Sequence, residues 1–118
     1  MKQTSAIPFN DDIEKLYRFL QLTTIPEKNF HIETHQNLQS VLPTECPPFR
    51  NNFYEISLVT GGSSISFQIN QQEFRTPQQY IVLTSPQQVR SWKGIQRDLE
   101  GFVLFFDLTI LEDVRTDN

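Results

Sequence analysis

Apolar residues repeat at helical spacing in one segment near the N-terminus. Within residues 10–22 they occupy the i, i+3, i+4 and i+7 positions of a single helix face, namely Ile13, Leu16, Tyr17 and Leu20. Asn10 or Asp11 can cap the first turn, because a short polar side chain accepts hydrogen bonds from free backbone N–H groups. Residues 23–26, which end in a proline, stop the pattern. We therefore expect a helix over residues 10–22.

From about residue 30, the apolar and polar residues alternate with the two-residue period of β-strands. Short segments of this kind cover residues 30–34, 53–60, 65–69, 73–75, 80–83, 89–92 and 101–106. Turn residues separate them at intervals of about 8–12 residues, which is typical of a β-sandwich or barrel. The sequence therefore predicts a mainly β fold, a jelly-roll-like antiparallel β-barrel with a short N-terminal helix.

Two further patterns refine this expectation. Pro43, Pro47 and Pro48 predict a loop after the first strand, because proline cannot donate a hydrogen bond to a central ladder. Residues 81–83 and 102–106 are apolar at consecutive positions. Strands with such continuous apolar runs are usually buried on both sides, so we expect both faces of these two strands to be covered.

The charge balance argues against DNA binding by this chain alone. The 118 residues fit one domain, and their formal charge is −4. A domain that holds DNA usually carries a basic patch or stripe. The one loose basic group consists of Arg90, Lys93 and Arg97, and it lies beside Asp98 and Glu100. We expect a solvated turn at this group.

Cys46 is the only cysteine, which excludes a disulfide framework and a thiolate metal cluster within the chain. It has no obvious activating neighbour, so we expect an inert thiol. No apolar run approaches the about 18 residues that span a bilayer, and the N-terminal segment lacks the apolar stretch of a secretory signal. We expect a cytoplasmic protein without membrane contact.

Two stretches resemble the cupin motifs in the sensor domains of AraC-type bacterial transcription regulators. The first is Pro48-Phe49-Arg50-Asn51-Asn52-Phe53-Tyr54-Glu55-Ile56 followed by Gly61-Gly62, and the usual form in that family is Pro-His-x-His-x-x-Tyr-Glu-Ile. The second is Thr84-Ser85-Pro86-Gln87-Gln88-Val89-Arg90-Ser91-Trp92, where the family usually has Ser-Pro-Gly-Gln-Val-His-x-Trp. Residues 99–106 resemble the strand that follows. The resemblance covers nearly the whole chain.

The resemblance implies a single cupin-like domain over residues 1–118. The leading arm and helix would occupy residues 1–28, the barrel residues 29–107, and the start of a linker residues 108–118. Domains of this family sense a small-molecule effector or mediate homodimerisation, and they are not enzymes. DNA would be bound only by a C-terminal helix-turn-helix domain that this chain lacks. These expectations rest on analogy with the family.

The sequence departs from the family pattern at the positions that hold a metal in metal-binding cupins. The resemblance places Phe49, Asn51 and Arg90 where those proteins have histidine ligands. A phenyl ring cannot coordinate a metal, an amide does so weakly, and a guanidinium repels a cation. Glu55 is the one ligand type that remains, and one carboxylate does not make a site. We expect no metal and no other cofactor.

Two histidines, His31 and His35, lie outside these motifs. If both lie on or beside the first strand, their spacing places them on one side but roughly 13 Å apart. We therefore expect ordinary structural histidines rather than a metal site.

The resemblance also implies where an effector would bind. The former metal positions face the barrel interior, which nominates Phe49, Asn51 and Arg90, and the nearby Tyr54, Glu55 and Trp92 can add walls and hydrogen bonds. The planar guanidinium of Arg90 suits a carboxylate or a pair of sugar hydroxyls. In the alternative, Arg90 forms an ion pair with Glu55 that fills a barrel binding nothing.

Catalytic motifs are missing from the sequence, so we name no catalytic residue. It contains no Gly-x-Ser-x-Gly, phosphate-binding loop or dinucleotide-binding fingerprint. Two alternatives to the sensor domain remain open. One is a stand-alone, metal-free cupin that binds a small molecule or a carbohydrate. The other is a cupin enzyme such as an isomerase or a dioxygenase.

Overall fold

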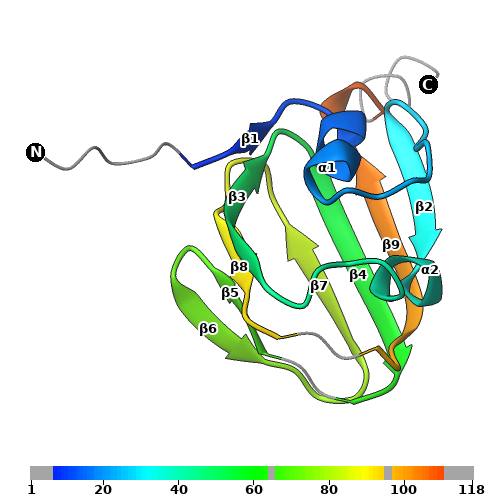
Figure 1. The fold of residues 1–118 in the computed structure, drawn as a ribbon, viewed down its shortest axis with the longest axis vertical. Helices are drawn as coiled ribbons and strands as arrows, with labels where there is room; N and C mark the ends of the chain where they lie inside the picture. The colour runs from blue at the N-terminus through cyan, green and yellow to red at the C-terminus, as the bar shows by residue number, and fades with distance from the viewer. Residues whose placement is uncertain (1–6, 64–65, 95–96, 111–118) are drawn as a thin grey trace, which may run out of the picture.

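Two β-sheets face each other in the computed structural model, which describes residues 7–63, 66–94 and 97–110 (Figure 1). The first sheet has the order β1 (Phe9–Asn10), β3 (Cys46–Asn51), β8 (Arg90–Trp92), β5 (Ser66–Ile69) and β6 (Gln72–Arg75). The second has the order β2 (Phe30–Thr34), β9 (Glu100–Phe106), β4 (Tyr54–Gly61) and β7 (Tyr80–Thr84). The predicted mainly β fold is confirmed. The described strands pair as two separate sheets and not as one closed barrel.

The strands expected from the alternating pattern are present, and their described bounds differ from the expected ones by at most one residue. Two strands were not expected. β1 is only two residues long and pairs with β3 in parallel, whereas the other pairs are antiparallel. β3 contains Pro47 and Pro48, so the predicted loop over these prolines is wrong. The register of β3 against β8 shifts between Cys46 and Phe49, and β1 pairs only with Arg50 and Asn51, so the two prolines occupy a stretch of irregular pairing.

Helix α1 (Ile13–Phe19) is shorter than the expected helix over residues 10–22. Its N-cap is Asp12, whose carboxylate accepts a hydrogen bond from Lys15 N at 2.8 Å. The predicted caps are therefore wrong, because the backbone of Asn10 belongs to β1. At the other end, Gln21 has a φ of 61°, which is incompatible with a continuing right-handed helix. The predicted apolar stripe is confirmed, since its four members are buried.

A second helix, α2 (His35–Gln39), begins directly after β2 and was not expected from the sequence. Thr34 is its N-cap and accepts a hydrogen bond from Asn37 N at 3.1 Å. His35 is thus the first residue of a helix and does not extend the first strand. Leu38 and Gln39 are buried, so tertiary contacts hold a helix too short to be stable alone.

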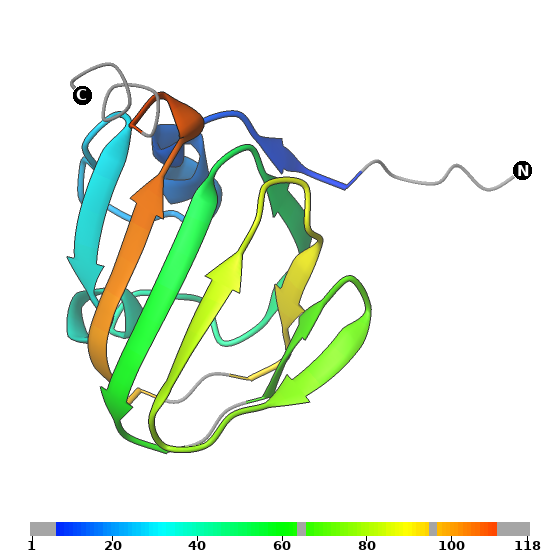
Figure 2. The same ribbon diagram turned by 180° about the vertical axis from the view of Figure 1, so that it is seen from behind.

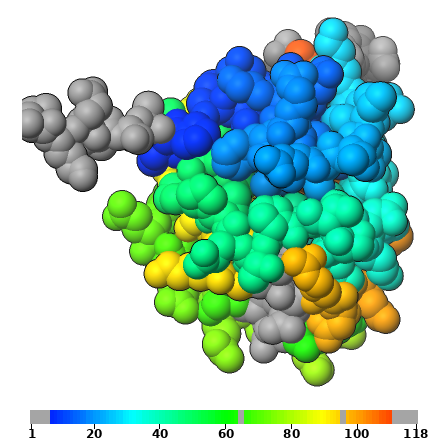
Figure 3. All heavy atoms as spheres, viewed as in Figure 1, coloured from blue at the N-terminus to red at the C-terminus, as the bar shows by residue number. Residues whose placement is uncertain are grey.

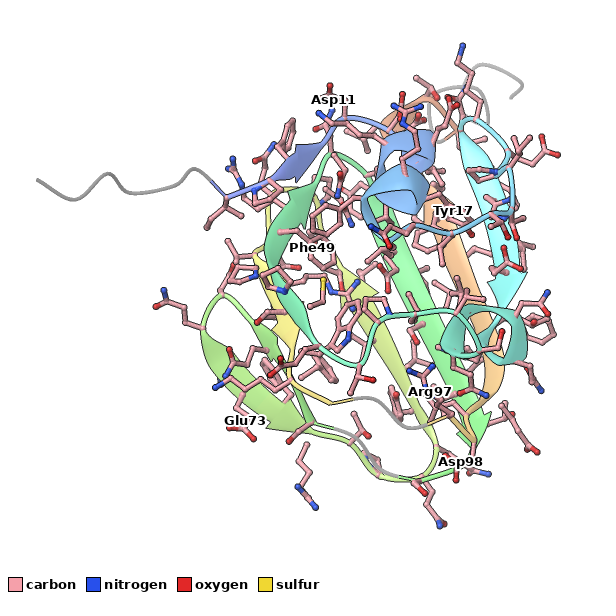
Figure 4. All side chains as sticks on the ribbon, viewed as in Figure 1. Asp11, Tyr17, Phe49, Glu73, Arg97 and Asp98 are labelled. Carbon is pink, nitrogen blue, oxygen red and sulfur yellow. The ribbon has the colours of Figure 1, made fainter. Side chains whose placement is uncertain are left out.

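Both helices lie on the inner side of the second sheet. The Tyr17 ring of α1 packs edge-on against Phe105 of β9, with ring centroids 6.0 Å apart (Figure 4). The chain from α1 to the start of β3 covers the upper and middle part of this side of the molecule (Figure 3). The core lies beneath it, between the sheets, and its buried apolar members are Ile13, Leu16, Tyr17, Leu20, Leu38, Cys46, Phe49, Phe53, Val103 and Phe105.

The outer side of the second sheet is open, as Figure 2 shows. Ile81, Leu83 and Phe102 are exposed, whereas Val103 and Phe105 point inward and are buried. The prediction that β7 and β9 are covered on both faces is therefore wrong. Their continuous apolar runs place one apolar set in the core and the other on the surface.

One glycine is required where β4 and β9 pair irregularly. The register of these strands shifts between Val59 and Gly61, opposite the start of β9. Gly101 there has a φ of +137°, and a Cβ atom on it would lie 2.0 Å from the carbonyl oxygen of Leu58. Only a residue without a side chain fits this position.

None of the described helices has the length and apolarity needed to cross a bilayer. Of the linker expected over residues 108–118, residues 111–118 lie outside the described part of the chain. Residues 108–110 are helical, and the carboxylate of the preceding Asp107 accepts a hydrogen bond from Thr109 N at 3.0 Å.

Candidate functional site

A cavity of about 120 Å³ lies between the two sheets. Apolar cavities of about 150 Å³ in other proteins hold a benzene molecule, and this one is somewhat smaller, on the scale of a small ring or a short chain. Its walls come from both sheets and both helices. The polar and aromatic groups that shape it, with one aliphatic residue of β7, are Tyr17, His35, Phe49, Glu55, Ser57, Tyr80, Val82, Arg90 and Trp92.

An ion pair joins the two sheets across this interior. The Nη1 atom of Arg90 on β8 contacts the Oε1 atom of Glu55 on β4, and the side chains are 17% and 11% exposed, respectively. The guanidinium carbon of Arg90 also lies 6.0 Å from the ring centroid of Phe49. Arg90 Nε is buried and has no hydrogen-bond partner in the described structure. An unpartnered buried N–H carries a free-energy cost, which the ion pair and the contact with Phe49 offset.

Aromatic rings form the wall beside Arg90. Phe49 is buried, and its ring packs edge-on against Trp92 at a centroid distance of 6.0 Å. The Phe19 ring of the segment that ends α1 lies 5.4 Å from Phe49 on a tilted plane. The indole N–H of Trp92 donates to the carbonyl oxygen of Pro43 at 3.0 Å, which fixes the orientation of the ring.

The remaining polar groups in the cavity wall are uncharged at neutral pH. His35 Nε2 and Ser57 Oγ form a hydrogen bond of 3.0 Å, and burial lowers the pKa of His35. Burial raises the pKa of Tyr80, and this effect exceeds the opposing effects of the Thr76 hydrogen bond and the Arg90 charge. Arg90 and Glu55 are thus the charged side chains of the cavity wall.

Four of the six residues nominated from the sequence line the cavity, namely Phe49, Glu55, Arg90 and Trp92. Asn51 and Tyr54 do not. Asn51 is buried elsewhere on β3 and accepts a hydrogen bond from Asn10 Nδ2 at 2.9 Å. The Tyr54 ring stacks on Phe106 with centroids 5.2 Å apart. Because successive strand residues point to opposite faces, Tyr54 and Glu55 cannot both face inward.

His35, Ser57 and Tyr80 also line the cavity and were not expected there from the sequence. Ser57 and Glu55 are two positions apart on β4, so strand alternation alone could have identified Ser57. His35 reaches the cavity from α2, and the helix itself was not expected. The ion pair proposed as the alternative to a ligand clamp is present, and the cavity remains open beside it.

A second buried polar cluster surrounds Glu33 on β2. Its carboxylate accepts hydrogen bonds from Tyr17 Oη at 2.9 Å and from Asn37 Nδ2 at 3.2 Å, and it lies 3.0 Å from His31 Nε2. His31 Nδ1 accepts from Glu27 N, so Nε2 carries the proton that points to Glu33. Burial raises the pKa of Glu33, but these hydrogen bonds outweigh it and lower the pKa. The cluster joins α1, β2 and α2, and each of its three other side chains forms a hydrogen bond with Glu33.

Other titratable groups lie apart from the cavity chemistry. Burial raises the pKa of the Cys46 thiol to about 11, with the Arg90 charge opposing it, which agrees with an inert thiol. His31 and His35 contact different partners. No cluster of three or more potential metal-ligating side chains occurs among residues 7–63, 66–94 and 97–110.

The expectation of a solvated basic turn is wrong for Arg90, whereas Lys93 and Arg97 are exposed. Arg90 lies in the interior, as described above. Arg97 contacts the carbonyl oxygen of Gln39 and donates from Nη2 to Leu42 O at 3.1 Å and to Thr44 Oγ1 at 3.3 Å. It therefore ties the chain before β9 to the segment after α2 (Figure 4).

No protein-family model matches the chain, and neither the search of curated proteins nor the search of solved structures found a match.

Proposed function

We propose that this chain is a non-catalytic sensor domain of the cupin-like kind found in AraC-type transcription regulators, and that it binds a small effector between its sheets. The observation that carries the proposal is the cavity itself. It combines aromatic and aliphatic walls with a single largely buried ion pair. Apolar walls with a few convergent polar groups are the usual character of small-molecule sites. In this proposal a DNA-binding domain outside this chain responds to the effector.

The order of the strands supports the jelly-roll part of the proposal. Across one sheet the strands have the order β2, β9, β4 and β7. Across the other they have the order β1, β3, β8, β5 and β6. Apart from the β5–β6 hairpin, successive strands from β2 to β9 alternate between the sheets. A double Greek key, the arrangement of jelly rolls and cupins, has this alternation.

The chemistry of the ion pair favours a neutral effector that carries a hydroxyl group. A hydroxyl can donate a proton to the Glu55 carboxylate and accept a hydrogen bond from Arg90, so it leaves the pair intact. A carboxylate ligand would instead compete with Glu55 for the guanidinium and place two negative charges together. We therefore propose a small neutral compound with an apolar ring or short chain and one or two hydroxyls.

The hydrogen-bonding of the cavity supports a binding role over catalysis. Ser57 and His35 have the separation of a nucleophile and its base. Such a pair needs a third group to orient the base, and the two buried carboxylates of this region are engaged elsewhere. Glu33 binds Tyr17, His31 and Asn37, and Glu55 binds Arg90.

A cavity-filling variant tests the binding proposal. Val82 on β7 lines the cavity, and its neighbour Leu83 points to the outer surface. A library of small phenols and alcohols with matched carboxylates would be screened by ligand-observed NMR. We expect neutral hydroxyl compounds to bind the unmodified chain, to lose binding to Val82→Phe and to keep it to Leu83→Phe. Binding that survives in Val82→Phe places the ligand elsewhere, and preferential binding of carboxylates refutes the proposed ligand class.

A metal assay separates the cupin-enzyme alternative from this proposal. Elemental analysis of protein purified without added metal is expected to show substoichiometric iron, manganese and zinc. One equivalent of any of these metals would favour the enzyme.

A further inference from the structure

The outer side of the four-stranded sheet is an apolar surface that extends over every strand of that sheet. Its most exposed members are Phe30, Ile32, Leu58, Ile81, Leu83 and Phe102, which we call the outer apolar face. Ile81 is 69% exposed, Leu83 55%, Ile32 51% and Phe102 50%. Monomeric proteins rarely expose a continuous apolar patch larger than a few hundred Å². A continuous face of this kind is a candidate interaction surface.

Strand register makes this surface continuous. Phe102 on β9 pairs with Leu58 on β4, and Leu58 pairs with Ile81 on β7, so the three side chains form one row across the sheet. A parallel row runs from Ile32 through Leu104 and Ile56 to Leu83. Directly opposed side chains in such rows lie close enough to touch each other, so the apolar surface is continuous from strand to strand.

The helices leave this surface uncovered. α1 and α2 pack on the opposite side of the sheet, and Figure 2 shows β2, β9, β4 and β7 side by side with no helix in front of them. The alternation of the strands explains the division. Glu55 and Ser57 point into the cavity from β4, whereas Leu58 points outward, so one strand serves both surfaces.

The charge distribution favours a second copy of the chain as the occupant. Both rows lack charged side chains, and Glu100 at the start of β9 is the one charged residue at an outward position of these four strands. The formal charge of −4 is therefore carried mainly by other surfaces. Two acidic chains can meet through this face without placing like charges together, whereas a strongly charged partner gains nothing from it.

The size of the face fits a reversible dimer. Four strands about 4.8 Å apart and seven residues rising about 3.3 Å each give a face of about 20 by 23 Å. Contact between two such faces buries on the order of 1,000 Å² before protruding side chains are counted, close to the low end of specific interfaces. Sheets of this kind pack face to face with their strands about 30° apart.

We propose that the outer apolar face is the interface of a homodimer in which the four-stranded sheets of two copies pack together about a twofold axis. This inference does not depend on the cavity or its ligand, because the two surfaces use opposite faces of the same strands.

The test is the oligomeric state of the whole chain and of surface variants. Sedimentation equilibrium of the unmodified chain is expected to show a monomer–dimer equilibrium with a Kd in the micromolar range, the monomer having a mass of 13.8 kDa. Ile81→Lys is expected to weaken the dimer at least tenfold. The double variant Ile81→Thr and Leu83→Thr keeps β-forming residues and should weaken it in the same direction, which separates loss of contact from loss of folding.

Matched controls lie on other surfaces. Val41→Lys and Ile25→Lys replace exposed apolar residues that are 52% and 86% exposed and lie outside the four strands. Both are expected to dimerise like the unmodified chain, and circular dichroism would check that every variant is folded. The proposal is overturned if the unmodified chain stays monomeric at a protein concentration of about 100 μM. It is also overturned if a folded Ile81→Lys variant dimerises normally. Equal loss of dimer in Val41→Lys overturns it as well.

Discussion

The side-chain amide of Gln39 forms a pair of hydrogen bonds with the backbone of Leu99. Its Nε2 donates to Leu99 O at 3.0 Å, and its Oε1 accepts from Leu99 N at 2.8 Å. Both residues are buried. The amide thus replaces a strand partner for Leu99, immediately before β9, and fixes the end of α2 to the entrance of that strand.

Replacement of Gln39 by leucine is expected to destabilise the protein by about 2–6 kcal/mol. The variant leaves two buried backbone groups without partners, and each costs about 1–3 kcal/mol. Urea unfolding followed by circular dichroism measures the change. Gln36→Leu is the control, because Gln36 lies on the same helix and is exposed. Equal effects of the two variants would show that the paired hydrogen bonds contribute little.

The Arg90–Glu55 pair predicts strong coupling between two positions on different sheets. Arg90→Met leaves Glu55 as an unpaired, largely buried carboxylate, which is expected to cost about 3 kcal/mol, at the low end for buried pairs because both side chains keep some exposure. The double variant Arg90→Met and Glu55→Gln is expected to recover most of that loss.

A double-mutant cycle in urea measures this coupling. Both variants are expected to lose effector binding, because either one removes the guanidinium. Additive changes in the free energy of unfolding would mean that the pair does not act as a unit. Normal ligand binding by the double variant would refute the role of Arg90 in the site.

His35 predicts a fall in stability on mild acidification. Burial lowers its folded-state pKa below the ordinary value of about 6.5. The unfolded chain therefore takes up a proton at a higher pH than the folded chain does, and the free energy of unfolding decreases as the pH falls below about 6.5. Glu33 acts in a separate window. Its lowered pKa contributes stability that is lost only as the pH falls below about 4.5.

Urea unfolding at about pH 7.5, 6.5 and 5.5 tests the role of His35, since these values span its ordinary pKa. His35→Gln keeps a side chain that can bind Ser57 and removes the titration, so the stability of this variant should vary less over that range. An unchanged pH dependence in His35→Gln would assign the effect to another group.

Gly101→Ala is expected to destabilise the protein by more than about 3 kcal/mol or to prevent folding. The added Cβ would overlap the carbonyl oxygen of Leu58 at a backbone φ of +137°. Gly94→Ala is the control, because a Cβ there meets no atom within 4 Å, and its effect should stay within about 0.5 kcal/mol. Thermal unfolding of both variants checks the difference, and a mild effect of Gly101→Ala would contradict the close approach of β4 and β9.

The sequence predicted those features of the fold that repeat along the chain. Strand alternation located the longer strands within one residue, and helical spacing identified the buried stripe of α1. It could not predict α2 or β3. α2 has five residues and depends on the burial of Leu38 and Gln39, and β3 runs through Pro47 and Pro48 because its pairing there is irregular. Contacts distant in sequence override local preference in both cases.

The candidate site was predictable to a similar extent. Motif resemblance nominated Phe49, Glu55, Arg90 and Trp92, which meet at the cavity. Tyr54 was nominated against the alternation rule and points outward. The apolar runs in β7 and β9 were interpreted as double coverage, because the sequence alone does not distinguish a buried outer face from an exposed apolar one.

The place of β9 between β2 and β4 has a consequence for folding during synthesis. Phe30 at the start of β2 pairs with Phe106 at the end of β9, so most of the described chain forms the loop between them. Pairings this distant in sequence fold slowly, because the entropy of loop closure is lost before contacts are gained. While the ribosome still holds β9, β2 and β4 lack their shared neighbour and present unpaired edges beside apolar side chains. The nascent chain is then most prone to aggregate, and it is then that a chaperone would engage it.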